Sequence, residues 1–220
     1  MLITGGDALS AEVARGVVAL EHCAIAAGGD ALTLLPRHVA RHRFEADLRL
    51  DRCTLVAGRS LVALGPWPGE APGPDRPWLV TSQGSAFLDG SNRIPREGVL
   101  LRVEPGAFAR GVLFWQAVND AYEVGHFLTG SDAPPAPNLR PDVRQQWVDL
   151  WGANHIRDVS GPSLASRTPY VRTLERLRPG DIAPGDLVLD PNYYPGRKAL
   201  DVGANPLRLG LPTVRTPRRR

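Results

Sequence analysis

The chain has 220 residues, of which 43% are hydrophobic, so it can bury a core and wholesale disorder is excluded. Its formal net charge is +3, an excess equal to the three arginines at its end, Arg218, Arg219 and Arg220. The rest of the chain is therefore close to neutral, which argues against a protein that coats nucleic acid with a broad basic face.

The N-terminal half contains one predicted helix and several predicted strands. Over residues 10–27, apolar residues recur at the spacing of an amphipathic helix, with Ser10 as its N-cap and Gly28 after its end. Residues 44–50 alternate between apolar and charged side chains, which predicts a strand with one solvated face. Residues 53–57 and 61–64 are typical of a hairpin around 58–60, so we expect a small antiparallel sheet here.

Two proline-rich loops divide the remaining elements. The first covers residues 65–77, and strands are predicted over 78–81 and 99–103. The longest helical pattern covers 106–128, with Phe108, Val112, Trp115, Val118 and Tyr122 on one stripe. The second loop, 131–141, precedes a helix predicted to end near 152. A short helix over 170–177 and a strand over 186–190 complete the predicted elements.

These elements predict an α+β protein in which a small antiparallel sheet packs with about three helices. Residues 1–190 are expected to form a single body, and residues 191–220 an extended, basic C-terminal arm that gains order on a partner surface. We find no internal repeat. No 18-residue apolar run and no apolar signal core occur, so no membrane contact is expected and the protein is predicted to be cytoplasmic, or part of a particle assembled in the cytoplasm. Cys23 and Cys53 form no CxxC pair, which favours two buried thiols in a reducing compartment.

Two groups of polar residues are candidates for catalysis. Glu123 and His126 form an ExxH step on the second predicted helix, with Asp120 one turn earlier, and a carboxylate beside an imidazole can raise its basicity. A polar stripe on a buried helix explains the same residues. The second group, His155 and Asp158, belongs to a polar stretch without regular period, which resembles an active-site loop in composition, although loop-capping bonds use the same residue types.

No cofactor or metal site is predicted. The chain has neither a GxxxxGK[ST] nor a GxGxxG motif, so ATP-driven and nicotinamide-linked chemistry are not expected. His38, His42 and Glu45 have the i, i+4, i+7 spacing of metal ligands on a helix, but the strand pattern that begins at residue 44 opposes a helix there.

Arginine dominates the basic residues, because only Lys198 among the 26 is a lysine. A guanidinium binds phosphate or carboxylate in bidentate fashion, although a GC-rich genome would also produce this bias. The candidate contacts to a polyanion or to a partner protein are Arg37, Arg41, Arg43, Arg218, Arg219 and Arg220.

The leading hypothesis is a non-enzymatic structural, assembly or adaptor protein of a multi-subunit complex, such as a phage-like particle. Its C-terminal arm would clasp neighbouring subunits in a homo- or hetero-oligomer. One alternative is a small hydrolase-like or metal-dependent enzyme that uses Asp120, Glu123, His126 and the His155 loop. A second alternative is local binding of nucleic acid or phosphate through the arginine clusters and the tail.

Overall fold

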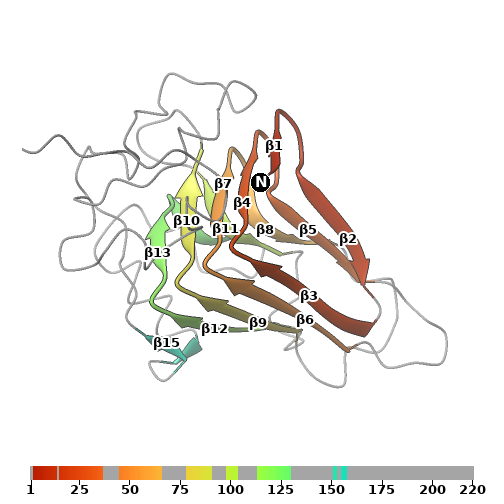
Figure 1. The fold of residues 1–220 in the computed structure, drawn as a ribbon, viewed down its shortest axis with the longest axis vertical. Helices are drawn as coiled ribbons and strands as arrows, with labels where there is room; N and C mark the ends of the chain where they lie inside the picture. The colour runs from red at the N-terminus through yellow and green to blue at the C-terminus, as the bar shows by residue number, and fades with distance from the viewer. Residues whose placement is uncertain are drawn as a thin grey trace, which may run out of the picture.

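The protein is described by a computed structural model, which places residues 2–13, 15–36, 45–65, 78–90, 98–103, 113–129, 151–152 and 155–157. Every element whose bounds lie in these residues is a strand. Fifteen strands form three sheets of five, and all the strand pairs are parallel. Figure 1 shows the chain winding from sheet to sheet in successive coils, from the red N-terminal strands to the teal β15. This arrangement is a parallel β-helix, or solenoid.

Each coil contributes one strand to each of the three sheets, which we name A, B and C. Sheet A contains β1 (Leu2–Thr4), β4 (Ala24–Ala27), β7 (Thr54–Ala57), β10 (Ala86–Asp89) and β13 (Ala121–Glu123). Sheet B contains β2 (Leu9–Val13), β5 (Leu32–Pro36), β8 (Ser60–Leu64), β11 (Val99–Arg102) and β14 (His126–Thr129). Sheet C contains β3 (Arg15–Glu21), β6 (Glu45–Asp51), β9 (Trp78–Gln83), β12 (Leu113–Val118) and β15 (Ile156–Arg157).

The core fills the interior of the coils with columns of apolar side chains in register. On sheet A, Ile25, Leu55, Phe87 and Tyr122 occupy matching positions of successive strands, and each is at most 4% exposed. The Phe87 and Tyr122 rings stack with centroids 5.1 Å apart, and Trp115 of sheet C meets Phe87 edge-on at 5.9 Å. Such burial of large rings is the main stabilising term between neighbouring coils.

The corner between sheets C and A repeats one backbone conformation in four coils. His22, Arg52, Gly84 and Asn119 hold this position with φ between 49° and 59°, a left-handed conformation that allows a tight turn. The residues that follow them are Cys23, Cys53, Ser85 and Asp120. Backbone hydrogen bonds continue from coil to coil through the corner, for instance from Arg52 N to Gln83 O at 2.8 Å.

The corner between sheets A and B is tight enough to require glycine. A Cβ atom on Gly28 would lie 2.1 Å from Gly5 O, and one on Gly58 would lie 2.4 Å from Gly28 O. The stacked turns therefore approach one another backbone to backbone, because no side chain separates them.

The predicted α+β class is wrong, because the described chain is nearly all β and its sheets are parallel. The predicted helix over 10–27 consists instead of β2, β3 and β4, and residues 113–128 of the second predicted helix form β12, β13 and β14. Two corners interrupt each of these segments. Inward residues are therefore spaced by two within a strand and by five across a corner, as in Val18, Leu20, Ile25 and Ala27, so the mean spacing imitates a helix.

The strands predicted over 44–50, 53–57, 61–64, 78–81 and 99–103 are confirmed as β6, β7, β8, β9 and β11. The hairpin predicted around 58–60 is wrong, since β7 belongs to sheet A and β8 to sheet B. A short turn after a strand indicates a hairpin only where the chain reverses, and this corner turns it onto another face of the coil.

The statement that the chain lacks an internal repeat is also wrong. The pentapeptide Gly-Gly-Asp-Ala-Leu occurs at residues 5–9 and again at residues 28–32, each time between the strand of sheet A and that of sheet B. The repeat is hidden because the connection from sheet B to sheet C varies, from Ala14 alone to the whole of residues 65–77.

Several predictions lie outside the described residues. They are the loop 131–141, the helix over 141–152 apart from its last two residues, the elements at 170–177 and 186–190, and the arm 191–220. The division into a body and an arm stays a prediction. Within the described ranges, no helix is long and apolar enough to cross a membrane.

Candidate functional site

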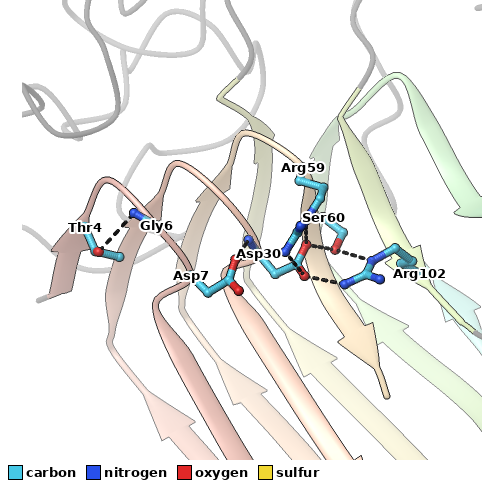
Figure 2. A network of polar contacts seen from close by, with 7 residues as sticks. All are labelled: Thr4, Gly6, Asp7, Asp30, Arg59, Ser60 and Arg102. Atoms are coloured by element: carbon cyan, nitrogen blue, oxygen red, sulfur yellow. Dashed lines mark hydrogen bonds and ion pairs between the residues drawn. The ribbon is translucent and has the colours of Figure 1, made fainter. Parts of the chain in front are cut away.

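A cluster of charged side chains lies at the corner between sheets A and B, and we call it the corner cluster. Its members are Asp7, Asp30, Arg59, Ser60 and Arg102 (Figure 2). Asp7, Asp30 and Arg59 occupy the connections from β1 to β2, from β4 to β5 and from β7 to β8, whereas Ser60 and Arg102 belong to β8 and β11. The cluster therefore joins four successive coils.

Asp30 is the centre of the corner cluster and is only 1% exposed. Arg59 binds its carboxylate in bidentate fashion, with Nε 2.8 Å from Oδ1 and Nη2 2.7 Å from Oδ2. Arg102 Nη2 donates to the same Oδ2, and Ser60 Oγ donates a short hydrogen bond to Oδ1. A buried carboxylate with this many donors is held in one orientation, because each oxygen has at least two partners.

Asp7 extends the corner cluster to the first coil. Its Oδ1 accepts from Arg59 Nη2 at 2.9 Å and from the backbone N–H of Asp30 at 2.8 Å. The side chains of Asp7 and Arg59 are 55% and 56% exposed, so this part of the cluster faces solvent. Two carboxylates balance two guanidinium groups, and the cluster as a whole is neutral.

The pKa of Asp30 shows which effect dominates in the cluster. Burial by itself raises the pKa of this carboxyl, but hydrogen bonds from Arg59 and Ser60 and the charges of Arg102 and Arg59 outweigh burial. The pKa of Asp30 is therefore lowered below its ordinary value of 3.8. The hydrogen bonds from Arg59 to Asp30 in turn raise the pKa of the Arg59 guanidinium. Asp30 is thus ionised at neutral pH, and a carboxylate of this kind is poorly suited to act as a general acid.

The corner between sheets C and A holds a second polar set, which we call the corner ladder: Cys23, Cys53, Ser85 and Asp120. Each of its side chains binds backbone atoms of its own or a neighbouring coil. Ser85 Oγ accepts from Cys53 N at 3.1 Å, and Cys53 Sγ lies 3.2 Å from Leu20 O. Asp120 Oδ1 accepts from Ser85 N at 2.7 Å. These side chains compensate backbone groups that the turn would otherwise leave unpaired.

Asp120 is completely buried in this ladder. Besides the bond from Ser85, its Oδ2 accepts a short hydrogen bond from Ser82 Oγ and one from Tyr122 OH at 3.3 Å. Trp115 Nε1 donates to the same Ser82 Oγ at 3.2 Å. Asp120, which the sequence analysis placed in a catalytic group, therefore connects β9 and β13 with the turn that precedes β10.

Cys53 provides a test of the buried corner ladder. Burial raises the pKa of the Cys53 thiol to about 12, so the reactive thiolate is scarce at neutral pH. We expect this thiol to resist alkylation by iodoacetamide in the native protein and to react once the chain is unfolded in denaturant.

The same shift gives a dependence of stability on pH. A raised pKa in the folded state means that the neutral thiol favours folding below the ordinary thiol value of 9.0, and this contribution falls as pH rises from about 9 toward about 12. Cys53→Ser should remove that part of the alkaline loss. Rapid labelling of Cys53 in the native state, measured by peptide mass spectrometry against Cys23, would contradict the buried ladder.

The structure separates the other residues of the proposed catalytic group. Glu123 ends β13 and is 1% exposed, in register with Leu88 of β10. Its neighbour Tyr122 faces the core, so the alternation of the strand directs Glu123 to the outer face of sheet A. His126 begins β14 on sheet B, beyond the corner. The helical spacing that would place Glu123 and His126 on one face is absent here, because a corner lies between them.

His155 lies at a different place, beside sheet C. Its ring meets Phe114 edge-on with centroids 4.7 Å apart, and its Nδ1 is 3.4 Å from Gln116 Nε2. Trp151 also contacts Phe114, at 6.0 Å. Asp158, the second residue of the predicted loop, lies outside the described residues.

None of the predicted arginine contacts can be placed. Arg37, Arg41, Arg43, Arg218, Arg219 and Arg220 all lie outside the described residues. The arginines that the structure does bring together, Arg59 and Arg102, were missed from the sequence. The repeated Gly-Gly-Asp-Ala-Leu was the signal that could have found this corner, since it aligns Asp7 with Asp30.

No group of three or more His, Cys, Asp or Glu side chains in the described part of the chain is arranged to hold a metal ion. The chain matches no family model, and neither a curated protein nor a solved structure shows significant similarity to it.

Proposed function

We propose that this protein is a non-enzymatic structural or assembly protein, which works as a subunit or adaptor of a multi-subunit complex. The observation that supports the proposal best is that hydrogen bonds within the protein occupy its buried carboxylates. Asp30 and Asp120 both have their oxygens occupied by hydrogen bonds between coils. Carboxylates held in this way stiffen the coil stack. Their present hydrogen-bond donors would have to be released before either carboxylate could act on a substrate.

The shape of the stack is a second support. Neighbouring coils contact one another through parallel sheets, so the molecule is quasi-one-dimensional (Figure 1). Rigid rods of this kind are suited to hold other subunits at fixed positions. A phage-like particle is one setting that would use such a part.

The C-terminal arm is the partner-binding segment that we propose from the sequence. Residues 191–220 are rich in proline and glycine and end in three arginines, a composition that gains order on a neighbouring surface. In this proposal the arm clasps adjacent subunits, and its arginines pair with acidic groups of the partner.

Truncation of the arm tests this function. We expect the full chain to form an oligomer in size-exclusion chromatography with light scattering, and a chain that ends at Leu211 to dissociate at least in part. A chain with Arg218, Arg219 and Arg220 replaced by glutamine is the matched control, because it keeps the length and removes only the charge. A monomer of unchanged mass for the full chain and the truncated chain would contradict the proposal.

A further inference from the structure

The corner ladder contains both cysteines of the chain, Cys23 and Cys53, and both thiols are free. Each cysteine follows the left-handed residue of its corner and directly precedes a strand of sheet A. The next residues, Ala24 and Thr54, are paired in register, and Thr54 N donates to Cys23 O at 2.8 Å. The two cysteines therefore stand one above the other in successive coils.

The two thiol groups have the same orientation relative to the backbone. Cys23 Sγ lies 3.4 Å from the carbonyl oxygen of Glu21, two residues earlier. Cys53 Sγ lies 3.4 Å from the equivalent carbonyl oxygen, that of Asp51. Cys53 Sγ is also 3.2 Å from Leu20 O, which belongs to the preceding coil. The Cys53 thiol thus already extends toward the coil that leads to Cys23.

The spacing of the coils matches the geometry of a disulfide bond. Neighbouring strands of a sheet lie about 4.8 Å apart, and this distance separates residues that are stacked in register. Cysteines joined by a disulfide have Cα atoms about 4.4–6.8 Å apart, so Cys23 and Cys53 can be bonded by rotation of their side chains alone. Within the described residues, no third His, Cys, Asp or Glu joins them in a group that could hold a metal ion, which favours a disulfide over a zinc site.

The two thiols differ in their access to solvent. Cys23 is half-buried, whereas Cys53 is completely buried, so an oxidant reaches Cys23 first. Burial is the main reason why the pKa of Cys53 is raised to about 12, and the charge of Cys23 contributes to the same shift, so the two groups are close enough to interact. An accessible thiol beside a second, resolving thiol is the arrangement in which oxidation ends at a disulfide.

We propose that Cys23 and Cys53 are a redox-sensitive pair, which hydrogen peroxide converts into a disulfide between successive coils. The Cys23 thiolate attacks one peroxide oxygen, the O–O bond breaks, and the leaving hydroxide takes up the proton that Cys23 released. Cys23 is then a sulfenic acid. Cys53 Sγ bonds to Cys23 Sγ while the S–O bond breaks, and the hydroxyl group leaves as water with the Cys53 proton. The two thiols are thus oxidised, and the peroxide is reduced to water.

The disulfide would join the coils covalently at one corner of the stack. It closes a loop that contains β4, β5 and β6, which together form one complete coil, and such a bond restricts the unfolded chain. We therefore expect oxidation to stabilise the coil stack and reduction to restore its original stability. This inference rests on the corner ladder and is independent of the C-terminal arm.

Peptide mass spectrometry tests the pair directly. Trypsin cuts after arginine, so Cys23 lies on the peptide 16–37 and Cys53 on the peptide 53–59. The folded, reduced full chain is treated with hydrogen peroxide, and the remaining free thiols are blocked with iodoacetamide in denaturant. We expect the two peptides to be joined, with the loss of one hydrogen from each thiol, and dithiothreitol to separate them.

Unfolded protein and single substitutions provide the controls. In concentrated urea the cross-link should form roughly tenfold more slowly or worse, because unfolding removes the proximity of the two thiols. Cys53→Ser should stop at the sulfenic acid of Cys23, which dimedone traps. Cys23→Ser should leave the buried Cys53 largely unreacted. Circular dichroism of both variants confirms that the coils are intact.

The thermal midpoint measures what the bond does to the stack. We expect the oxidised chain to unfold roughly 5 °C or more above the reduced chain, and this difference to vanish after reduction and in either serine variant. The proposal is overturned if peroxide leaves the two peptides of the folded chain separate, if the cross-link joins two different chains, or if it forms equally fast in urea. A disulfide that lowers the thermal midpoint would likewise refute the stabilising link between coils.

Discussion

Replacing Asp30 by alanine is expected to lower the free energy of unfolding by about 1–3 kcal/mol, because it removes the shared acceptor of Arg59, Ser60 and Arg102, although the half-exposed guanidinium groups regain water. The loss should exceed that of a surface substitution, since the corner cluster joins four coils and each coil depends on contacts with its neighbours. Urea unfolding followed by circular dichroism measures it. An effect below about 1 kcal/mol would mean that the cluster contributes little to the stack.

Two further measurements separate the charge of Asp30 from its shape. Because the folded-state pKa of Asp30 is lowered, its ionised form stabilises the protein above the ordinary value of 3.8, and this stabilisation is lost as pH falls through the lower folded-state pKa. Asp30→Asn keeps the shape and should flatten the acid part of the stability profile. Asp7→Asn is the graded control, since Asp7 is 55% exposed and should cost only about 1 kcal/mol.

Replacing Asp120 by alanine is expected to lower the free energy of unfolding by about 3–5 kcal/mol. The change removes the acceptor of Ser85 N–H, Ser82 O–H and Tyr122 O–H in a site with no exposure to solvent. A buried donor that loses its acceptor costs its desolvation, about 1–3 kcal/mol for each group. The midpoint and slope of chemical unfolding measure the loss.

The isosteric change Asp120→Asn distinguishes the structural role from a catalytic one. Asparagine keeps an oxygen for Ser85 N–H, so its cost should be smaller than that of alanine, about 1–2 kcal/mol. If Asp120 were a catalytic carboxylate, both the alanine and the asparagine variant would lose turnover, and neither would lose much stability. Equal stability of the alanine variant and the parent chain would refute the assignment of Asp120 to the corner ladder.

The corner cluster and the corner ladder both supply partners to polar groups at the turns between sheets, but they use different side chains. At each turn between sheets, backbone groups and short polar side chains are no longer paired by the hydrogen bonds between strands. Such groups need other hydrogen-bond partners when they are buried. The ladder uses small uncharged groups and one carboxylate that face inward, such as Ser85 and Asp120. The cluster uses charges at the rim, where the half-exposed Arg59 and Arg102 neutralise the buried Asp30.

Part of the candidate site could be predicted from the sequence, and part could not. The repeated Gly-Gly-Asp-Ala-Leu aligns Asp7 and Asp30 directly, so two members of the corner cluster could have been paired from the sequence. Arg102 has no such signal, since it is 72 residues from Asp30 and reaches it only because β11 stacks two coils beyond β5. Asp120, Glu123 and His126 are close in sequence, but a corner directs Glu123 and His126 to different sheets.

The sequence by itself determined where five of the fifteen strands lie, namely β6, β7, β8, β9 and β11. The alternation over 44–50 and the β-branched and apolar runs at 53–57 and 61–64 are local patterns, and local patterns specify an extended backbone with one buried face. The same reasoning failed over 10–27 and 106–128, where spacings of two and five residues average close to the helical period. Residue spacing alone cannot distinguish a helix from two strands that meet at a corner.

Only the tertiary structure decided how the strands pair. A strand that follows a short turn can return as a hairpin or continue onto the next face of a coil, and the choice depends on contacts between residues of different coils. Here the close approach of Gly28 to Gly5 stacks one turn directly on the next, and the left-handed residues His22 and Arg52 lie in the turns that lead the chain from sheet C to sheet A. Parallel pairing of distant segments then follows, because each apolar column is completed only by the equivalent residues of the coils beside it.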